Sequence, residues 1–287
     1  MSTLVESPSR SRSKQSSRKP GQWLIWALLA VGAVGMIFPV YWMFVTALSP
    51  ASQAEKSTFY LWPSSLEWSN FVDVWHTQPV GSWFVNSIII AVLGVVLTVA
   101  VSLLAGYAFA KYEFWGRDVL FVALLVTIMV PIQVIMVPEF VLVSKLGLVD
   151  SPWAVILPRS AEAIAVFMAR QFMLGVPSEL IEAARVDGAG EFRIFMRIVL
   201  PLSGPLVGVL VIISFVWRWN DFVWPLIALQ GQGNYTLPIG LSSMNSLYQS
   251  PWESIMAVSL LSLIPTVIIF FLFQRQFVQG VASTGLK

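Results

Sequence analysis

Charged side chains are scarce in this sequence, yet many of them fall within one short segment. Of the 287 residues, only 11% are Asp, Glu, Lys or Arg. The segment 175–200 nonetheless carries Glu179, Glu182, Arg185, Asp187, Glu191, Arg193 and Arg197. Carboxylates and guanidinium groups at this density can pair with one another or with charges on a partner protein. This segment is therefore the first candidate for a functional site.

A second group of polar residues interrupts stretches that are otherwise apolar. Ionisable side chains at membrane depth are costly and mark functional sites by default. Gln133 and Glu139 lie close to Pro131 and Pro138, and prolines free carbonyl groups that lipid cannot satisfy. We therefore expect a kinked helix there, with its polar groups turned toward protein or water.

Two other pairs in this group leave two interpretations open. Arg159 and Glu162 are three residues apart, close enough to pair on a helix. They either neutralise each other at a subunit interface or line a cavity. Asn220 and Asp221 form part of a polar pathway or hinge, or they end a helix before Pro225. All six residues are candidates for a translocation pathway.

Residues for catalysis or metal binding are nearly absent. The chain has no Cys and one His, His76, which fits a surface position beside Asp73. The P-loop pattern GxxxxGK[ST] does not occur, and Gly-Lys is absent altogether. We predict that the chain is not an enzyme and has no catalytic, cofactor or metal site of its own.

The elements that position these residues are membrane helices. Hydrophobic residues make up 57% of the chain, above the roughly 45–50% of soluble domains. This composition excludes a soluble enzyme, a disordered tail protein and a nucleic-acid binder. A span needs about 20 apolar residues. Six stretches meet or approach that length, and we predict an all-α membrane protein with spans at 23–49, 83–110, 119–143, 152–174, 201–229 and 254–273.

The distribution of Lys and Arg predicts the orientation. Residues 1–20 are polar and basic, and we expect a disordered cytoplasmic arm that meets anionic headgroups. With the N-terminus inside, the outer side holds Lys56, Lys145 and Arg218. Most other basic residues then lie inside, as the positive-inside rule requires. We predict a multi-pass cell-membrane protein with both termini in the cytoplasm, where segment 175–200 also lies.

The inner segment 175–200 has the pattern of two short helices. Pro177 and Ser178 can begin the first helix, and Gly188 can end it because glycine adopts the left-handed conformation cheaply. The second helix is expected to place Phe192, Phe195, Ile198 and Val199 on one face. An amphipathic loop resting on lipid headgroups is the simpler interpretation.

The order of residues in this segment is more specific than its composition. Glu182-Ala183-Ala184 is followed after three residues by Gly188, after nine more by Ile198, and after one more by Leu200-Pro201. This resembles the EAA signature of importer-type ABC permeases, EAA-x3-G-x9-I-x-LP. The version with Asp187-Gly188-Ala189 resembles the carbohydrate branch in particular. The motifs Trp219-Asn220-Asp221-Phe222 and Thr236-Leu237-Pro238 resemble the family's fifth-span motif and last outer loop, and the chain is similar to the smaller, maltose-type permease subunit.

The resemblance implies a fold, a role and a set of partners. The fold is the type I ABC importer permease fold over residues 21–287, with a coupling loop at 175–200. The role is ATP-driven import of an oligosaccharide or, alternatively, of a glycerol-phosphate compound. The implied partners are a second homologous permease, two ATP-binding subunits that hold ATP and Mg, an extracytoplasmic solute-binding protein and the lipid bilayer.

The resemblance also implies three groups of contact residues. Those that couple to the ATPase are Glu182, Ala183, Ala184, Asp187, Gly188, Ile198, Leu200 and Pro201. Contact with the binding protein is expected at Asn234, Tyr235, Thr236, Leu237 and Pro238. Tail contact with the ATPase is expected at Gln274, Arg275 and Gly280.

Two other classes of protein remain as alternatives. A membrane-embedded enzyme needs a clustered set of reactive groups, which one His and no Cys do not supply. It would turn over a substrate without ATP. A channel or stand-alone secondary transporter would work without an ATPase partner. Such folds often carry internal repeats, and the sequence shows no convincing second copy of the EAA segment.

Overall fold

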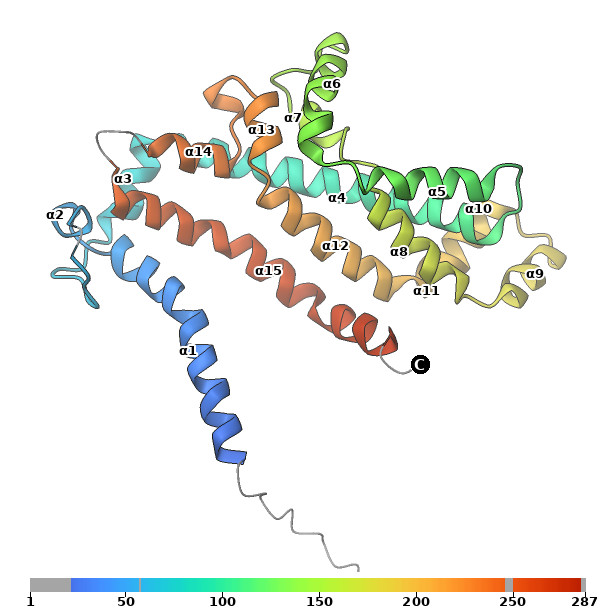
Figure 1. Cartoon of the computed structure of the whole chain (residues 1–287), viewed down its shortest axis with the longest axis horizontal. Coiled ribbons are helices and arrows are strands. Elements are labelled where there is room, and N and C mark those ends of the chain that lie inside the picture. The colour runs from blue at the N-terminus through green and yellow to red at the C-terminus, as the bar shows by residue number, and fades with distance from the viewer. Residues whose placement is uncertain (1–21, 57, 246–249, 285–287) are drawn as a thin grey trace, which may run out of the picture. The chain divides into compact units, whose positions relative to one another are not determined.

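The computed structural model describes residues 22–56, 58–245 and 250–284 (Figure 1). By their internal contacts the residues form two compact units, Met1–Trp42 and Met43–Lys287. The first unit consists of most of α1 (Gln22–Ala47), which continues through Pro39. The predicted arm, residues 1–20, lies outside the described residues and stays a prediction.

The second unit contains helices and no strand among the residues that the structure describes. Its α-helices are α2 (Ala51–Ala54), α3 (Ser69–Thr77), α4 (Val80–Lys111), α5 (Arg117–Thr127), α6 (Ile132–Lys145), α7 (Pro152–Ile156), α8 (Ala163–Leu174), α9 (Ser178–Val186), α10 (Glu191–Ile194), α11 (Leu200–Leu202), α12 (Gly204–Trp219), α13 (Val223–Ala228), α14 (Leu237–Met244) and α15 (Trp252–Thr284). The π-helix η1 (Phe195–Val199) joins α10 to α11, and the 3₁₀-helix η2 (Gln232–Asn234) precedes α14.

Helix α4 forms the centre of this unit, packing against α8 and α12, while α12 also packs against α15 (Figure 1). Small residues on α4 allow these helices to approach closely. A Cβ atom on Gly106 would lie 2.5 Å from the Ala169 Cβ of α8. The hydrophobic effect does not drive helices together within lipid, so close packing of small residues contributes much of the association.

Three of the predicted spans are interrupted close to a proline residue. A proline ring clashes with the carbonyl group four residues before it and removes one helical hydrogen bond. Pro131 follows the end of α5, Pro158 follows the end of α7, and Pro225 follows the break between α12 and α13.

The predicted third span is therefore not one kinked helix. Its two parts, α5 and α6, are bent by 104° at the break. Among the described residues, three helices are long and apolar enough to cross a membrane alone, and the number reaches six if each bent pair is one span. The predicted all-helical fold with six spans fits this arrangement.

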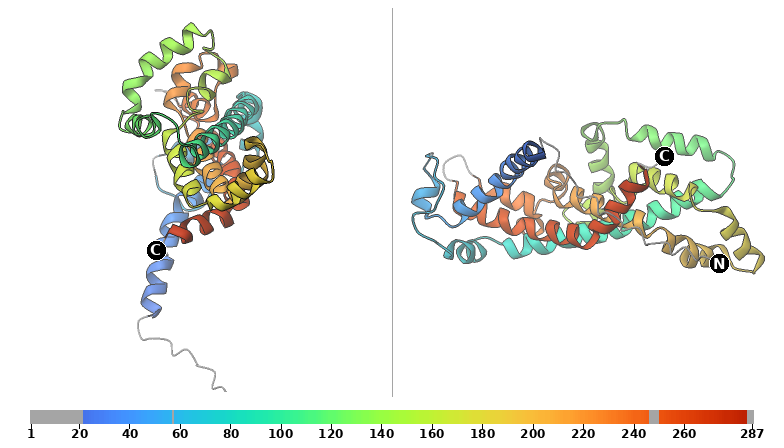
Figure 2. Two further views of the ribbon diagram at one scale, coloured as in Figure 1. Left: turned by 90° about the vertical axis from the view of Figure 1, so that its right-hand side faces the viewer. Right: turned by 90° about the horizontal axis from the view of Figure 1, so that it is seen from below.

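The two ends of α4 contact two different segments, the predicted coupling segment 175–200 and the predicted binding-protein contact 234–238. At its C-terminal end, the Lys111 Nζ donates a 2.5 Å hydrogen bond to the carbonyl of Val176, just before α9. At its N-terminal end, the Ser87 hydroxyl accepts a 2.8 Å hydrogen bond from the backbone N–H of Leu237. Helix α4 has 32 residues, a length of about 48 Å at 1.5 Å per residue. Figure 2 shows α9 and α10 at the opposite end of this unit from α3.

Candidate functional site

Helix α9 carries three of the predicted coupling residues, Glu182, Ala183 and Ala184, and it ends directly before Asp187 and Gly188, as the glycine predicted. Gly188 has a φ of 78°. Its backbone N–H donates a 3.0 Å hydrogen bond to the carbonyl of Arg185, and the N–H of Ala189 donates a 2.9 Å bond to that of Ala184. This pair of bonds is the Schellman motif, which satisfies the last carbonyls of a helix.

A hydrogen-bonded group holds α9 against the start of α10 and the end of α4. The Glu191 carboxylate accepts hydrogen bonds from Arg185 Nε at 2.7 Å and Nη2 at 3.2 Å. It also accepts a 2.5 Å hydrogen bond from the Tyr112 hydroxyl. These donors lower the pKa of Glu191, while burial and then the hydrogen bond to Glu191 raise the pKa of Tyr112. We call this group the Glu191 cluster. It restrains α9 at the turn that follows its last residue.

An apolar contact fixes the other side of α9. Ile181 is buried in an apolar cluster that also contains Met173 of α8, Ile194 of α10 and Leu206 of α12. Interiors packed at this density transmit displacement rather than absorb it. This cluster connects α9 to α8 and α12.

The outward side of α9 and its turn is open. Glu182, Ala183, Asp187 and Gly188 are exposed, and Val186 is 88% exposed. Among the described residues, the carboxylates of Glu182 and Asp187 form no ion pair within the chain, and the nearby Arg185 pairs with Glu191 instead. The predicted coupling residues thus combine free carboxylates with a small apolar surface.

The rest of the coupling segment differs from the prediction in two details. Ser178 does not cap α9; its hydroxyl lies 3.3 Å from Lys111 Nζ. Phe192 was expected on the apolar face with Phe195, yet it is 75% exposed. The buried face is formed by Ile194, Phe195 and Val199 instead. Ala184, Ile198 and Leu200 are half-buried, and Pro201 is exposed within α11.

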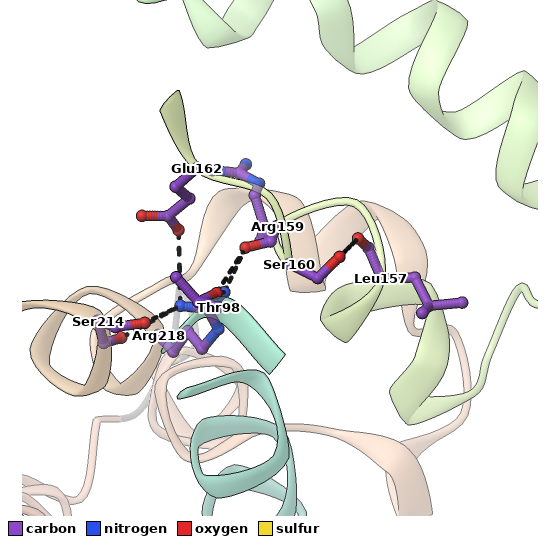
Figure 3. Close-up of polar contacts among 7 residues, drawn as sticks. All are labelled: Thr98, Leu157, Arg159, Ser160, Glu162, Ser214 and Arg218. Carbon is purple, nitrogen blue, oxygen red and sulfur yellow. Dashed lines mark hydrogen bonds and ion pairs between the residues drawn. The ribbon is translucent and has the colours of Figure 1, made fainter. Parts of the chain in front are cut away.

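Arg218 forms a buried polar centre deep among the helices (Figure 3). Its Nη2 donates a 2.7 Å hydrogen bond to the Thr98 hydroxyl of α4 and a second one to the carbonyl of Arg159. Its Nη1 donates to the Ser214 hydroxyl and lies 3.5 Å from a Glu162 carboxylate oxygen. The side chain is only 5% exposed. A buried arginine is stable only when paired and hydrogen-bonded in this way.

This centre corrects two sequence-based predictions. The charge count assigned Arg218 to the outer side, whereas it contacts the middle of α4 through Thr98. Arg159 and Glu162 were expected on one helix, where they would either neutralise each other or line a cavity. They lie in the non-helical break between α7 and α8, where Glu162 pairs with Arg218 and Arg159 contributes its carbonyl.

A pocket of about 310 Å³ lies beside Arg218. It is lined by Arg159, Glu162, Val216, Trp217, Arg218, Asn220 and Asp221, and we call it the polar pocket. Four of the six predicted pathway residues are thus brought together. Glu139 of α6 is half-buried and does not line the pocket, and Gln133 is exposed elsewhere on α6.

The predicted binding-protein contact is largely turned inward in this conformation. Thr236 and Leu237 are buried, while Asn234, Tyr235 and Pro238 are half-buried. The Asp150 carboxylate accepts 2.9 Å hydrogen bonds from the backbone N–H groups of Gln230 and Gly231, which lowers the pKa of Asp150. The Asn234 amide donates a 2.9 Å bond to the Asp150 carbonyl. The residues exposed at the loop tip are Gln232 and Gly233.

The predicted tail contacts lie near the end of α15. Gln274 is half-buried and Arg275 is exposed. Gly280 lies in the last part of α15, where the side chains are outside the described residues. These contacts stay predictions.

Comparison with known proteins identifies the family. The family model described as "Binding-protein-dependent transport system inner membrane component" matches residues 99–283, which include α9, the Glu191 cluster and the polar pocket. The chain belongs to this family. The resemblance on which the sequence-based prediction depended is therefore confirmed.

Two relatives illustrate the breadth of this family of membrane components. The "Arabinooligosaccharides transport system permease protein AraQ" of Halalkalibacterium halodurans is 37% identical over 268 residues, covering 92% of this chain and 96% of that protein. The "sn-glycerol-3-phosphate transport system permease protein UgpE" of Yersinia pestis bv. Antiqua is 36% identical over 265 residues, covering 90% and 94%.

The fold has a solved counterpart. The structure described as a bacterial ABC transporter involved in the import of the acidic polysaccharide alginate contains a chain that matches with a TM-score of 0.81 and 22% identity. The match covers 94% of this chain and 100% of that one. The predicted importer-permease fold is confirmed.

The functional residues that sequence reasoning missed are those that hold the predicted ones in place. Tyr112 and Arg185 position the coupling segment, and Thr98 and Ser214 position Arg218. Their partners are up to 120 residues away in the chain, so no local pattern marks them. Arg218 itself stands directly before the Trp219-Asn220-Asp221 motif, a signal that could have indicated it.

Proposed function

We propose that this chain is one membrane subunit of an ATP-driven importer of oligosaccharides. It pairs with a second, homologous permease, and two ATP-binding subunits on the cytoplasmic side hold ATP and Mg²⁺. An extracytoplasmic solute-binding protein delivers the solute at the opposite side. Both termini and the coupling segment lie in the cytoplasm, as the distribution of Lys and Arg favours.

The observation that carries this proposal is the two-sided construction of α9. Its outward side offers Glu182, Ala183 and Val186 to a partner, and its inward side is fixed by Ile181 and the Glu191 cluster. Closure of the ATP-binding subunits moves the docked α9. Because Ile181 shares one buried apolar cluster with Met173 and Leu206, we expect α8 and α12 to move with α9 and to change the access to the pathway.

The solute class is supported by the relatives and by the sugar-importer resemblance. AraQ is named for arabinooligosaccharides and UgpE for sn-glycerol 3-phosphate. We favour an oligosaccharide because the pathway candidates Glu162, Asn220 and Asp221 offer hydrogen-bonding groups without an excess of positive charge. The tip residues Gln232 and Gly233 are then the surface offered to the binding protein.

The test is purification of the tagged chain from its native membranes, followed by reconstitution into vesicles. We expect an ATP-binding subunit and a second permease to co-purify, and neutral oligosaccharides to enter the vesicles only when ATP and the binding protein are supplied. Uptake that persists without an ATP-binding subunit would contradict the proposal and favour a stand-alone transporter.

A further inference from the structure

The chemical groups that line the polar pocket limit the class of solute that it could bind. It opens at the surface of the chain, since Trp217 is 51% exposed and Asn220 is exposed. Its lining combines hydrogen-bonding groups with one indole ring. Ligand sites typically pair an apolar surface with a few polar groups that fix orientation.

The pocket's hydrogen-bonding groups are only partly used within the chain. The two terminal nitrogens of Arg218 are occupied by Thr98, Ser214, the Arg159 carbonyl and Glu162. Among the described residues, no hydrogen bond or ion pair holds the Arg159 side chain. The Asn220 amide donates a 2.8 Å bond to the carbonyl of Val216, which leaves its oxygen free to accept. Donors from Arg159 and acceptors from Glu162, Asn220 and Asp221 therefore remain for a ligand.

A sugar ring presents the complementary set of groups. Each hydroxyl both donates and accepts a hydrogen bond, so carboxylates, an amide oxygen and a guanidinium can all serve it. The apolar face of the ring matches the exposed face of Trp217, since aromatic side chains supply a large apolar surface. A hydrocarbon or lipid tail would leave the charged groups of the pocket unpaired.

The charge of the pocket separates neutral from acidic solutes. Its two cations, Arg159 and Arg218, are balanced by the two carboxylates Glu162 and Asp221. Glu139 adds a third carboxylate within electrostatic range of Arg159 and Asp221. Proteins bind phosphate and carboxylate groups with unbalanced arginines or lysines. In this pocket a phosphate meets at least as many negative charges as positive ones, which opposes its binding.

We propose that the polar pocket is a hydroxyl-binding subsite for a neutral oligosaccharide, and that its balanced charge excludes phosphorylated and acidic solutes from the pathway. This inference rests on the proposed function, because it needs the pocket to face the translocation pathway. Trp217 supports the ring, Asp221, Asn220 and Glu162 accept from hydroxyls, and Arg159 donates to them. Arg218 is a positioning residue, since its two terminal nitrogens are used within the chain.

The experiment measures uptake by the complete transporter, co-purified with its partners and reconstituted into vesicles. The probes are a labelled mixture of neutral arabino- and malto-oligosaccharides and, separately, labelled sn-glycerol 3-phosphate. We expect ATP-dependent uptake of the neutral probe only. Trp217→Ala and Asp221→Asn are each expected to raise its apparent KM about tenfold, which corresponds to one good hydrogen bond or ring contact.

Two variants serve as matched controls. Trp153→Ala removes a tryptophan that is 45% exposed on α7, and Asp118→Asn removes an exposed aspartate on α5. Neither residue lines the pocket, so both are expected to keep the normal KM. Asp221→Asn also removes one negative charge, so unlabelled sn-glycerol 3-phosphate is expected to compete with the neutral probe more strongly than in the unaltered protein.

The outcomes distinguish this inference from the proposed function. Any one of three results would overturn the subsite. These are ATP-dependent uptake of sn-glycerol 3-phosphate, uptake of neither probe by a complex that hydrolyses ATP, and an unchanged KM in Trp217→Ala. Trp217 is exposed, so its variant remains informative even if Asp221→Asn fails to assemble. A chain that co-purifies with no ATP-binding subunit overturns the proposed function itself.

Discussion

Gly188 offers the sharpest test of how the coupling segment works, because its substitution changes conformation without crowding any neighbour. Its φ of 78° lies in the left-handed region, and no atom lies within 4 Å of the position that a Cβ would occupy. The cost of Gly188→Val is therefore the backbone cost alone. That cost is roughly 1–2 kcal/mol for an ordinary residue in this region, and more for a β-branched one.

This free-energy cost is small relative to the stability of the whole protein but large relative to the stability of the single turn that ends α9. A change of about 1–2 kcal/mol shifts an equilibrium roughly 5–30-fold. The equilibrium affected is between the closed and frayed forms of the turn made by the Ala189–Ala184 and Gly188–Arg185 hydrogen bonds. We expect the complex to assemble normally, while solute transported per ATP hydrolysed falls several-fold. The assay is paired measurement of uptake and ATP hydrolysis in reconstituted vesicles.

Two control variants isolate the effect. Gly147→Val imposes the same kind of strain, since Gly147 has a φ of 68° and open space around it, but it follows α6 rather than α9. Gly188→Asn places at the same turn a residue that tolerates left-handed φ. Both controls are expected to keep most of the coupling. Normal coupling in Gly188→Val, or an equal loss in Gly147→Val, would refute the reasoning.

Three further predictions concern the contacts around these sites. Glu191→Gln weakens an exposed ion pair by about 0.2–1 kcal/mol, so coupled uptake falls by at most roughly fivefold while thermal stability stays unchanged. Gly94→Ala places a methyl group against the Arg218 side chain, and disturbing its buried pair with Glu162 is expected to cost about 3–5 kcal/mol in thermal unfolding. Asp150→Asn weakens the hydrogen bonds to Gln230 and Gly231, so proteolysis of the outer loop quickens about tenfold. Because the pKa of Asp150 is lowered from 3.8, acidification is expected to loosen this loop only below that value.

Each of these predictions has an outcome that would contradict it. Tyr112→Phe removes one neutral donor from the Glu191 cluster and should have a smaller effect than Glu191→Gln; the reverse order would argue against the ion pair. Gly204→Ala, with no neighbour within 4 Å, is the control for Gly94→Ala, and equal losses would show a general helix effect. Unchanged proteolysis in Asp150→Asn would mean that the outer loop is held by Asn234 instead.

The sequence predicted most reliably what depends on neighbouring residues. Gly188 predicted the end of α9 because its conformational freedom acts within one turn. The apolar stretches predicted where helices occur, and the EAA spacing predicted the family. Proline effects were underestimated, because Pro131, Pro158 and Pro225 end or separate helices that hydropathy alone had joined.

What the sequence did not predict depends on contacts between distant segments. Arg218 looked like an outer-side charge, and only its contact with Thr98, 120 residues away, shows that it is buried. Arg159 and Glu162 could be paired by spacing only if their segment were helical, which it is not. The exposure of Phe192 likewise depends on how α10 packs in the fold, because Ile194 and Phe195 bury the other side.

Cross-linking at α9 tests the central claim most directly, namely that this helix docks on an ATP-binding partner. The chain contains no cysteine, so a single introduced one can be labelled selectively. Ala183→Cys places it on the exposed side of α9, and Gln232→Cys places a control at the tip of the outer loop. With a photoreactive maleimide in native membranes, we predict an adduct with the ATP-binding subunit from Ala183→Cys and none from Gln232→Cys. No adduct from Ala183→Cys in assembled, transport-active complexes, or an equal adduct from both positions, would contradict the account.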